Sequence, residues 1–281
     1  MRTLSLDALR EAVTKLALEA AFDLPGDVQS ALETALAAET APLGREVLSM
    51  ILKNAAMARA ERVPLCQDTG MFNVFLELGP GVCLKGPPAP AVDAGIAMAT
   101  SEGHLRASLV SDPLVGRGNT GDNRPAFLYV EGAGIENQVR LTVMPKGGGS
   151  ENVTALKMLL PTATPEQLVE VIVEHVKEKA AFACPPVVVG IGIGGNADGA
   201  LKLSKKALLR DVRKPHPEPG YRRIEETTLE AINRLGIGPA GLGGYFTALA
   251  VMIEKAPTHI ACLPLGISLS CHALRRRSVV L

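Results

Sequence analysis

The sequence predicts a mixed α/β protein. Apolar residues recur at helical spacing over the first sixty positions, short apolar runs typical of strands follow, and two of these runs lead through glycine loops toward helices. The chain has 281 residues, of which 47% are hydrophobic, so it can bury a sizeable core. We expect an N-terminal helical segment over 1–60 and one continuous α/β region over 61–281, in a single domain or two lobes.

The opening segment is helical by its apolar spacing. A face of a helix is formed by Leu6, Leu9, Val13, Leu16 and Ala20. Similar patterns predict helices at about 27–39 and 42–60. These sixty residues therefore form a helical layer.

The middle of the chain alternates strands and helices. FNVFLEL reads as a strand, and an alanine-rich helix follows a proline-rich turn at about 89–102. Strands are expected at 126–131 and 138–144. The segment MPKGGGSEN then leads into a helix that is expected to begin near Glu151.

The second half repeats this arrangement. An amphipathic helix at about 164–181 precedes ACPPVVVGIGIGGNADG, where a short apolar strand runs into glycines and then into a helix that ends near Arg210. The proline-rich segment 211–221 reads as a surface linker, followed by a helix at about 222–235.

Composition excludes several classes of protein. Twenty-nine basic residues balance 29 acidic ones, so no general field attracts nucleic acid or an anionic membrane. The chain has no Trp, six Phe and three Tyr, which leaves few stacking platforms for single-stranded nucleic acid. No apolar stretch reaches the roughly 20 residues that span a bilayer, and the acidic residues of the opening helix do not suit a signal peptide. We expect a cytoplasmic protein.

Three glycine-rich segments are candidates for anion binding. KGGGSEN, GIGIGGN and GPAGLGGY each stand where a helix could begin, so their backbone N–H groups could converge on a carboxylate. Alternatively, the glycines permit tight turns and close packing.

One of these segments also matches a nucleotide-binding spacing. Gly190, Gly192 and Gly195 follow a valine run, and Asp211 stands where a ribose-binding acid is expected. The acid of that fingerprint normally ends a second strand, whereas Asp211 opens the linker. A nucleotide-dependent oxidoreductase remains an alternative function.

The five cysteines fall into two groups. Cys66, Cys184 and Cys271 stand beside turn formers or polar residues, whereas Cys83 and Cys262 have mostly apolar neighbours and are expected to pack in the interior. An odd count at low density favours reduced thiols, and no C-x-x-C pair indicates a zinc ribbon or a ferredoxin-like cluster. Spacing alone leaves the role of the first three open.

Six separated segments resemble the alpha region of the class I fumarase and tartrate dehydratase family. They are LCQDTG, SLVSDPLVGRGNTGDNRPA, MPKGGGSEN, ACPPVVVGIGIGGNAD, GPAGLGGYFTALAV and THIACLPLGISLSCHALRR, in family order over roughly residues 60–277. The resemblance implies that Cys66, Cys184 and Cys271 hold a 4Fe-4S cluster whose fourth iron has no protein ligand. Such an open iron acts as a Lewis acid toward a substrate hydroxyl and carboxylate, and the site is then a hydro-lyase site.

The resemblance also implies the substrate-binding residues. Gln67 and Asp68 contact substrate and position or relay a proton, while Arg106 binds a carboxylate. Gly149 donates its backbone N–H to a carboxylate, and His259 hydrogen-bonds near the site. The ordinary alternatives are a capped turn for Asp68, a solvated Arg106 and a core histidine for His259.

Two further segments remain without assigned roles. The polar loop that contains Asp112, Arg117, Asn119, Thr120, Asp122 and Asn123 is expected to shape the site. The run Arg275, Arg276 and Arg277 faces a partner or the substrate, or else is a solvated chain end.

The resemblance implies a partner, because this region alone supplies only part of the catalytic set. We expect a separate beta subunit that completes the active site in an α2β2-type hetero-oligomer. The expected reaction interconverts malate and fumarate. Dehydration of tartrate to oxaloacetate is the alternative within the family, since the substrates differ by one hydroxyl and no motif distinguishes them. A noncatalytic subunit that only carries the cluster is a third hypothesis.

Overall fold

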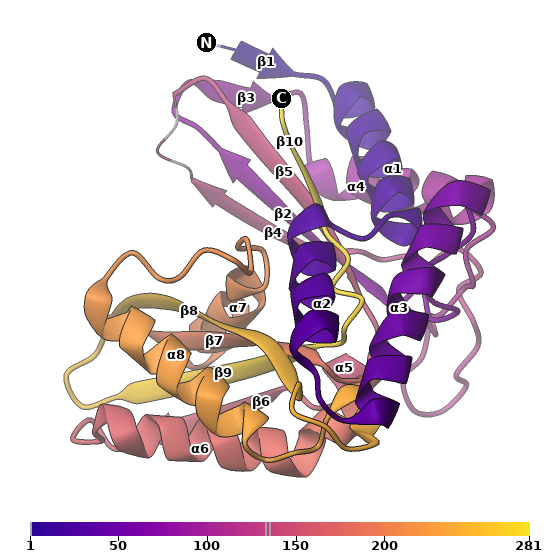
Figure 1. Cartoon of the computed structure of the whole chain (residues 1–281). Helices are drawn as coiled ribbons and strands as arrows, with labels where there is room; N and C mark the ends of the chain where they lie inside the picture. Colours follow the sequence, from indigo (N-terminus) through magenta and orange to yellow (C-terminus); the bar gives the residue numbers. More distant parts are fainter. Residues whose placement is uncertain (1, 133, 135) are drawn as a thin grey trace. The chain divides into compact units, whose positions relative to one another are not determined.

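The computed structural model describes residues 2–132, 134 and 136–281 (Figure 1). Its helices are α1 (Leu6–Phe22), α2 (Gly26–Ala38), α3 (Pro42–Glu61), α4 (Pro88–Glu102), α5 (Gly148–Glu151), α6 (Pro165–Lys179), α7 (Ala197–Ala207) and α8 (Pro219–Asn233), with 3-10 turns η1 (Ala180–Ala183) and η2 (Pro239–Gly241). Its strands are β1 (Arg2–Leu4), β2 (Met71–Leu78), β3 (Val82–Leu84), β4 (Phe127–Gly132), β5 (Val139–Lys146), β6 (Ala155–Leu159), β7 (Val187–Gly195), β8 (Ala248–Thr258), β9 (Leu263–Ser270) and β10 (Arg277–Val280). The predicted α/β class is confirmed.

The chain divides into two compact units. The first is built from the residues up to Pro25, from Ala55–Gly148 and from Arg275–Leu281; the second is built from Gly26–Asn54 and Gly149–Leu274. The opening helices are shared between them, with α1 in the first unit, α2 in the second and α3 crossing the boundary.

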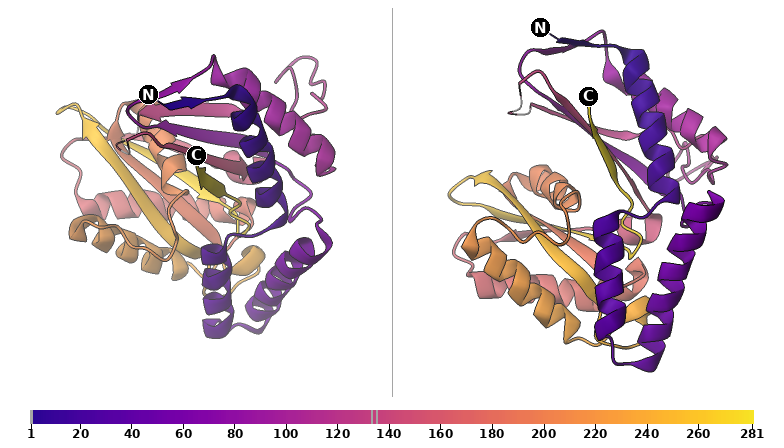
Figure 2. Two further views of the ribbon diagram at one scale, coloured as in Figure 1. Left: turned by 90° about the horizontal axis from the view of Figure 1, so that it is seen from above. Right: turned by 45° about the horizontal axis from the view of Figure 1, so that its top comes forward.

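The first unit contains a four-stranded sheet in the order β10-β5-β2-β4. Strand β2 runs parallel to β4 and antiparallel to β5, and β10 runs antiparallel to β5. Two further views show the C-terminal strand β10, in yellow, beside β5 (Figure 2). Segments from both ends of the chain therefore complete this unit.

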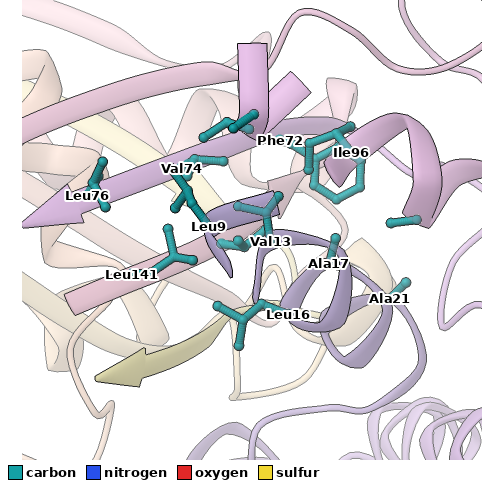
Figure 3. Close-up of a cluster of buried hydrophobic side chains, with 14 of the residues drawn as sticks. Leu9, Val13, Leu16, Ala17, Ala21, Phe72, Val74, Leu76, Ile96 and Leu141 are labelled. Carbon is teal, nitrogen blue, oxygen red and sulfur yellow. The ribbon is translucent and has the colours of Figure 1, made fainter. Parts of the chain in front are cut away.

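Helix α1 supplies much of the core of the first unit. Its hydroxyl cap is Ser5, whose side chain accepts a hydrogen bond from Ala8 N. The buried residues Leu9, Val13 and Leu16 belong to one hydrophobic cluster with alternate residues of β2 and with Leu141 of β5 (Figure 3). The apolar face that the spacing predicts for α1 is therefore buried in this cluster, together with one face of a strand.

The second unit contains a sheet in the order β6-β9-β7-β8. Strand β7 runs parallel to β8 and antiparallel to β9. Alternate residues of β7, among them Val189 and Ile191, join a core cluster with residues of α6 and α8. The intervening positions face α7, which covers the opposite face (Figure 1).

Glycine allows α7 to approach this sheet closely. A Cβ atom added to Gly192 would lie 2.1 Å from the carbonyl oxygen of Ala200, and one added to Gly190 would lie 2.2 Å from that of Ser204. On β9, a Cβ at Gly266 would lie 2.3 Å from the oxygen of Ala200. These glycines are therefore required for helix packing on the sheet.

Two sequence-based expectations about the elements between β5 and α8 are wrong. The helix expected to begin near Glu151 is a single turn, α5, which ends at that residue, and strand β6 follows from Ala155. The expected linker is partly helical, because α8 already begins at Pro219. Strands β8 and β9 were not assigned from the sequence.

The rest of the linker is fixed by a buried carboxylate. Glu225, which is 4% exposed, accepts hydrogen bonds from Arg210 Nη1 at 2.6 Å, His216 N at 2.7 Å and Ile253 N at 2.8 Å. The segment after α7 is thereby attached to α8 and to β8.

Among the described residues, no helix combines the length and apolar character that crossing a membrane requires.

Candidate active site

In the first unit, the Asp68 carboxylate joins two of the motif segments. Its Oδ1 accepts a hydrogen bond from Gly70 N at 2.9 Å, and its Oδ2 accepts one from Gly148 N at 2.8 Å. Cys66 is half-buried and Gln67 exposed in the same loop between α3 and β2. The turn expected at Asp68 is present, and it also holds the LCQDTG and KGGG segments together.

Arg106 is positioned through its backbone. Its carbonyl oxygen accepts hydrogen bonds from Thr69 Oγ1 at 2.7 Å and from Asn123 Nδ2 at 3.0 Å. Its side chain is exposed. Arg106 therefore lies beside the Asp68 loop with a guanidinium group that solvent can reach.

The polar loop is held mainly by hydrogen bonds to its own backbone and to neighbouring backbone. Most of its expected site residues bind nearby backbone: Asp112 accepts from Leu114 N and Val115 N, Arg117 donates to Pro113 O, and Asn119 donates to Ala107 O. Asp122 pairs with Arg124 and is also in contact with the side chain of Thr120. Asn123, which is fully buried, connects the loop directly to Arg106.

The arginine run is not a solvated chain end. Arg275 and Arg276 are 3% and 8% exposed. Arg277 forms an ion pair of 2.7 Å with Asp23. Arg275 Nη2 donates a hydrogen bond of 3.0 Å to the backbone oxygen of Asp68, which places this arginine beside the same loop.

In the second unit, two of the predicted cluster ligands lie next to each other. Cys184 ends the η1 turn in a left-handed conformation, with φ 52° and ψ 70°, and is exposed. Its carbonyl oxygen lies 3.2 Å from His272 N and 3.0 Å from His272 Nδ1. Since a carbonyl only accepts, Nδ1 carries a proton, and the Cys271–His272 pair is held beside Cys184.

Two glycine segments surround the Cys184 turn. A Cβ atom on Gly149 would lie 3.0 Å from the carbonyl oxygen of Phe182, so this position favours glycine. The carbonyl oxygen of Pro185 accepts a hydrogen bond of 2.8 Å from Ala240 N, in the η2 turn. No helix follows the GPAGLGGY segment, which leads into β8, so the expectation of a helix start there is wrong.

The buried carboxylate of Glu39 anchors the end of that segment. Oε1 accepts from Thr40 N and Ala41 N, and Oε2 accepts from Tyr245 N at 2.9 Å and Phe246 N at 3.1 Å. Burial raises the pKa of Glu39, but the four backbone donors outweigh it, and the pKa lies below its usual value. The carboxylate is 1% exposed and ties the turn before α3 to the loop before β8.

We expect Glu39→Gln to lower the free energy of unfolding by about 2–3 kcal/mol at neutral pH, because an amide cannot replace a carboxylate that accepts four N–H bonds. A lowered folded-state pKa stabilises the protein above the unfolded-state pKa, and this contribution is lost as pH falls through the folded-state value. Urea unfolding at pH 7 and pH 4 measures the free energy of unfolding of both proteins. The difference between wild type and variant should be smaller at pH 4. Glu33→Gln on the exposed side of α2 is the control, and an equal loss at both pH values would contradict the explanation.

His259 lies far from the cysteines of its own unit. It follows the C-terminal end of β8, whereas Cys184 precedes β7 and Cys271 follows β9. Because β7 and β8 are parallel and β9 is antiparallel to β7, the two cysteines stand at one end of the sheet and His259 at the other. The role expected of His259 in substrate binding stays a prediction.

The nucleotide-binding alternative has no matching geometry. Gly190 and Gly192 lie inside β7, where they admit α7, and not in a loop around a phosphate. Asp211 follows α7 and does not end a strand; a two-contact pair with the Arg213 guanidinium lowers its pKa to about 2. The fingerprint spacing is explained by packing.

The cysteines have the chemistry of cluster ligands. All five are thiols, and Cys66, Cys184 and Cys271 lie in loops as expected. In the part of the chain that the structure describes, no three His, Cys, Asp or Glu side chains are grouped to hold a metal ion. Cys66 belongs to the first unit, and the other two belong to the second.

Comparison with known proteins shows the family. A family model described as "Fumarate hydratase (Fumerase)" matches residues 10–280. The chain belongs to the fumarate hydratase family. This confirms the resemblance drawn from the six segments and makes the chain a subunit of a hydro-lyase.

Two relatives of this fumarate hydratase family chain cover nearly its whole length. A protein of Methanocaldococcus jannaschii named "Putative L(+)-tartrate dehydratase subunit alpha" is 42% identical over 95% of each chain. The "L(+)-tartrate dehydratase subunit alpha" of Escherichia coli strain K12 is 31% identical over 98% of this chain and 91% of its own.

The sequence reading of this family member missed two buried charges near the motif segments. Glu39 sits at the end of a predicted helix and looks like an exposed charge, and its partners Tyr245 and Phe246 are more than 200 positions away. Arg275 looks like one member of an exposed basic run. No local pattern distinguishes either residue, because their burial depends on distant segments.

Proposed function

We propose that this chain is the alpha subunit of a hydro-lyase that adds water to fumarate and removes it from malate. The observation that carries the proposal is the pair of contacts from His272 to the carbonyl of Cys184, which holds two loop thiols together. Membership of the fumarate hydratase family supplies the reaction class.

The proposed cofactor is a 4Fe-4S cluster on Cys66, Cys184 and Cys271. Three thiolates suit iron, and the iron without a protein ligand supplies Lewis-acid chemistry toward a hydroxyl or carboxylate. The exposed, left-handed Cys184 turn supports this role, since its thiol is not enclosed by an apolar interior.

The side chains around the thiols would bind and orient the substrate. Asp68 has its carboxylate fixed by Gly70 N and Gly148 N, and its remaining lone pairs can accept a proton from a hydroxyl or water. Gln67 is exposed and free to reorient toward substrate, and Arg106 offers a planar fork to a carboxylate. The backbone N–H of Gly149 is the proposed donor to a carboxylate in the second unit.

The proposal includes a partner. The relatives are named as alpha subunits, which supports a separate beta subunit. We propose that the two assemble as an α2β2-type complex located in the cytoplasm. That subunit would supply the remaining cations and the catalytic base.

Dehydration of L(+)-tartrate is the second candidate function. The names of both relatives favour it. The two substrates differ by one hydroxyl, so they would share the carboxylate and cluster contacts proposed above.

An assay of the assembled complex tests the proposal. The chain is co-expressed with its beta partner without oxygen, and hydration of fumarate and formation of oxaloacetate from L(+)-tartrate are followed separately. Turnover of fumarate at the higher kcat/KM would support the first candidate, and a preference for tartrate would select the second. Turnover of neither by an iron-loaded complex would overturn both.

A further inference from the structure

Arg275 is a buried cation that no side chain neutralises among the described residues. It is 3% exposed, and its Nε has no hydrogen-bond partner in the part of the chain that the structure describes. Within that part, its Nη2 donates a single hydrogen bond, of 3.0 Å, to the backbone oxygen of Asp68, and the side chain belongs to no ion pair. A buried charge without a counter-ion is costly, so an anion from outside the chain would stabilise it.

The sheet of the first unit brings Arg275 to the same end as the Asp68 loop. Strand β5 pairs Lys146 with Met71 of β2 on one side and Val143 with Arg277 of β10 on the other. The segments that lead into β2 and β10 therefore both reach the C-terminal end of β5. Lys146, only 2% exposed, is a second buried cation at this end.

The carboxylate of Asp68 is not hydrogen-bonded to Arg275. Asp68 directs its side-chain oxygens to Gly70 N and Gly148 N, and it meets Arg275 through its main-chain carbonyl. The end of β5 thus carries buried positive charge beside a residue of the proposed substrate site. A planar guanidinium with a donor to spare is suited to a carboxylate.

We propose that Arg275 binds one carboxylate of the dicarboxylic substrate, as a second arginine in addition to Arg106. This inference rests on the proposed function. It makes Arg275 a determinant of specificity for doubly charged acids. Its buried charge stabilises a bound carboxylate, whereas an uncharged group of the substrate would leave the guanidinium unpaired.

The test compares Arg275→Met, Arg275→Lys and the matched control Arg277→Met in the complex with the beta partner. We expect Arg275→Met to raise KM for the substrate about 10- to 100-fold with the visible absorbance of the cluster retained, and Arg275→Lys to recover part of the loss. Arg277 is paired with Asp23, so its variant should keep KM and melt at a lower temperature.

Thermal denaturation with succinate separates this inference from the proposed function. Succinate has two carboxylates and no hydroxyl to eliminate, and we expect it to raise the melting temperature of wild type and of Arg277→Met but not of Arg275→Met. Without ligand, Arg275→Met should melt at or above the wild-type temperature, because an uncompensated buried charge is gone. Unchanged KM and an unchanged succinate shift in Arg275→Met would overturn the inference. If wild type turns over neither acid, the proposed function fails. The change in melting temperature with succinate then tests by itself whether Arg275 binds a carboxylate.

Discussion

Anaerobic incubation with iron and sulfide is expected to load the wild-type chain with about four iron ions, and to leave Cys66→Ala, Cys184→Ala and Cys271→Ala without a stable cluster. The reason is the number of donors: with three protein thiolates, loss of any one leaves only two. Iron content and visible absorbance per chain measure the result.

The chain provides its own controls for this experiment. Cys83 and Cys262 are half-buried thiols, one within β3 and the other just before β9. Their alanine variants should bind as much iron as wild type. Equal iron loss in these variants, or full loading of Cys184→Ala, would contradict the proposed ligand set.

Gly192→Ala is expected to have the largest effect on stability, lowering the free energy of unfolding by about 3 kcal/mol. An added Cβ would lie 2.1 Å from Ala200 O and 2.6 Å from Ser204 N. Both are backbone atoms of α7, so relief requires the whole helix to move away from β7. Urea denaturation monitored by circular dichroism measures the change.

Gly220→Ala is the matched control. This glycine lies in α8, and an added Cβ meets no atom within 4 Å. Alanine should be neutral there or stabilise the protein by up to about 1 kcal/mol, because it loses less conformational freedom than glycine on folding. Similar small effects at both positions would mean that α7 packs less tightly on the sheet than the distances at Gly192 indicate.

The sequence predicts elements best where the pattern is local and long. Helix α1 is a clear case, because five apolar positions repeat over fifteen residues and the same face is buried. Helix α6 is another, since Thr164 and Gln167 form a capping box directly before an amphipathic run. In both helices, neighbouring residues determine the structure.

Strands that depend on distant partners could not be assigned in this way. Strand β10 has four residues and exists through its pairing with β5, and β6 replaces an expected helix because it pairs with β9. A short apolar run carries no information about which edge it will join.

The site was only partly predictable for the same reason. The motif segments identified the Asp68 loop and the cysteine loops, and the structure connects Asp68 to Gly148 and Cys184 to His272. It also separates His259 from the two cysteines of its unit by the length of the β7–β9 sheet. Sheet direction, which the segments do not encode, determines that separation.

The discontinuous first unit has a consequence for synthesis of the protein. Helix α1 and strands β2, β4 and β5 leave the ribosome long before β10, which forms the outer edge of their sheet. Until then, β5 presents an unpaired backbone edge, which is the kind of surface that recruits strands from other nascent chains. Pausing of translation before residue 275 would therefore prolong the period in which the protein is most prone to aggregate.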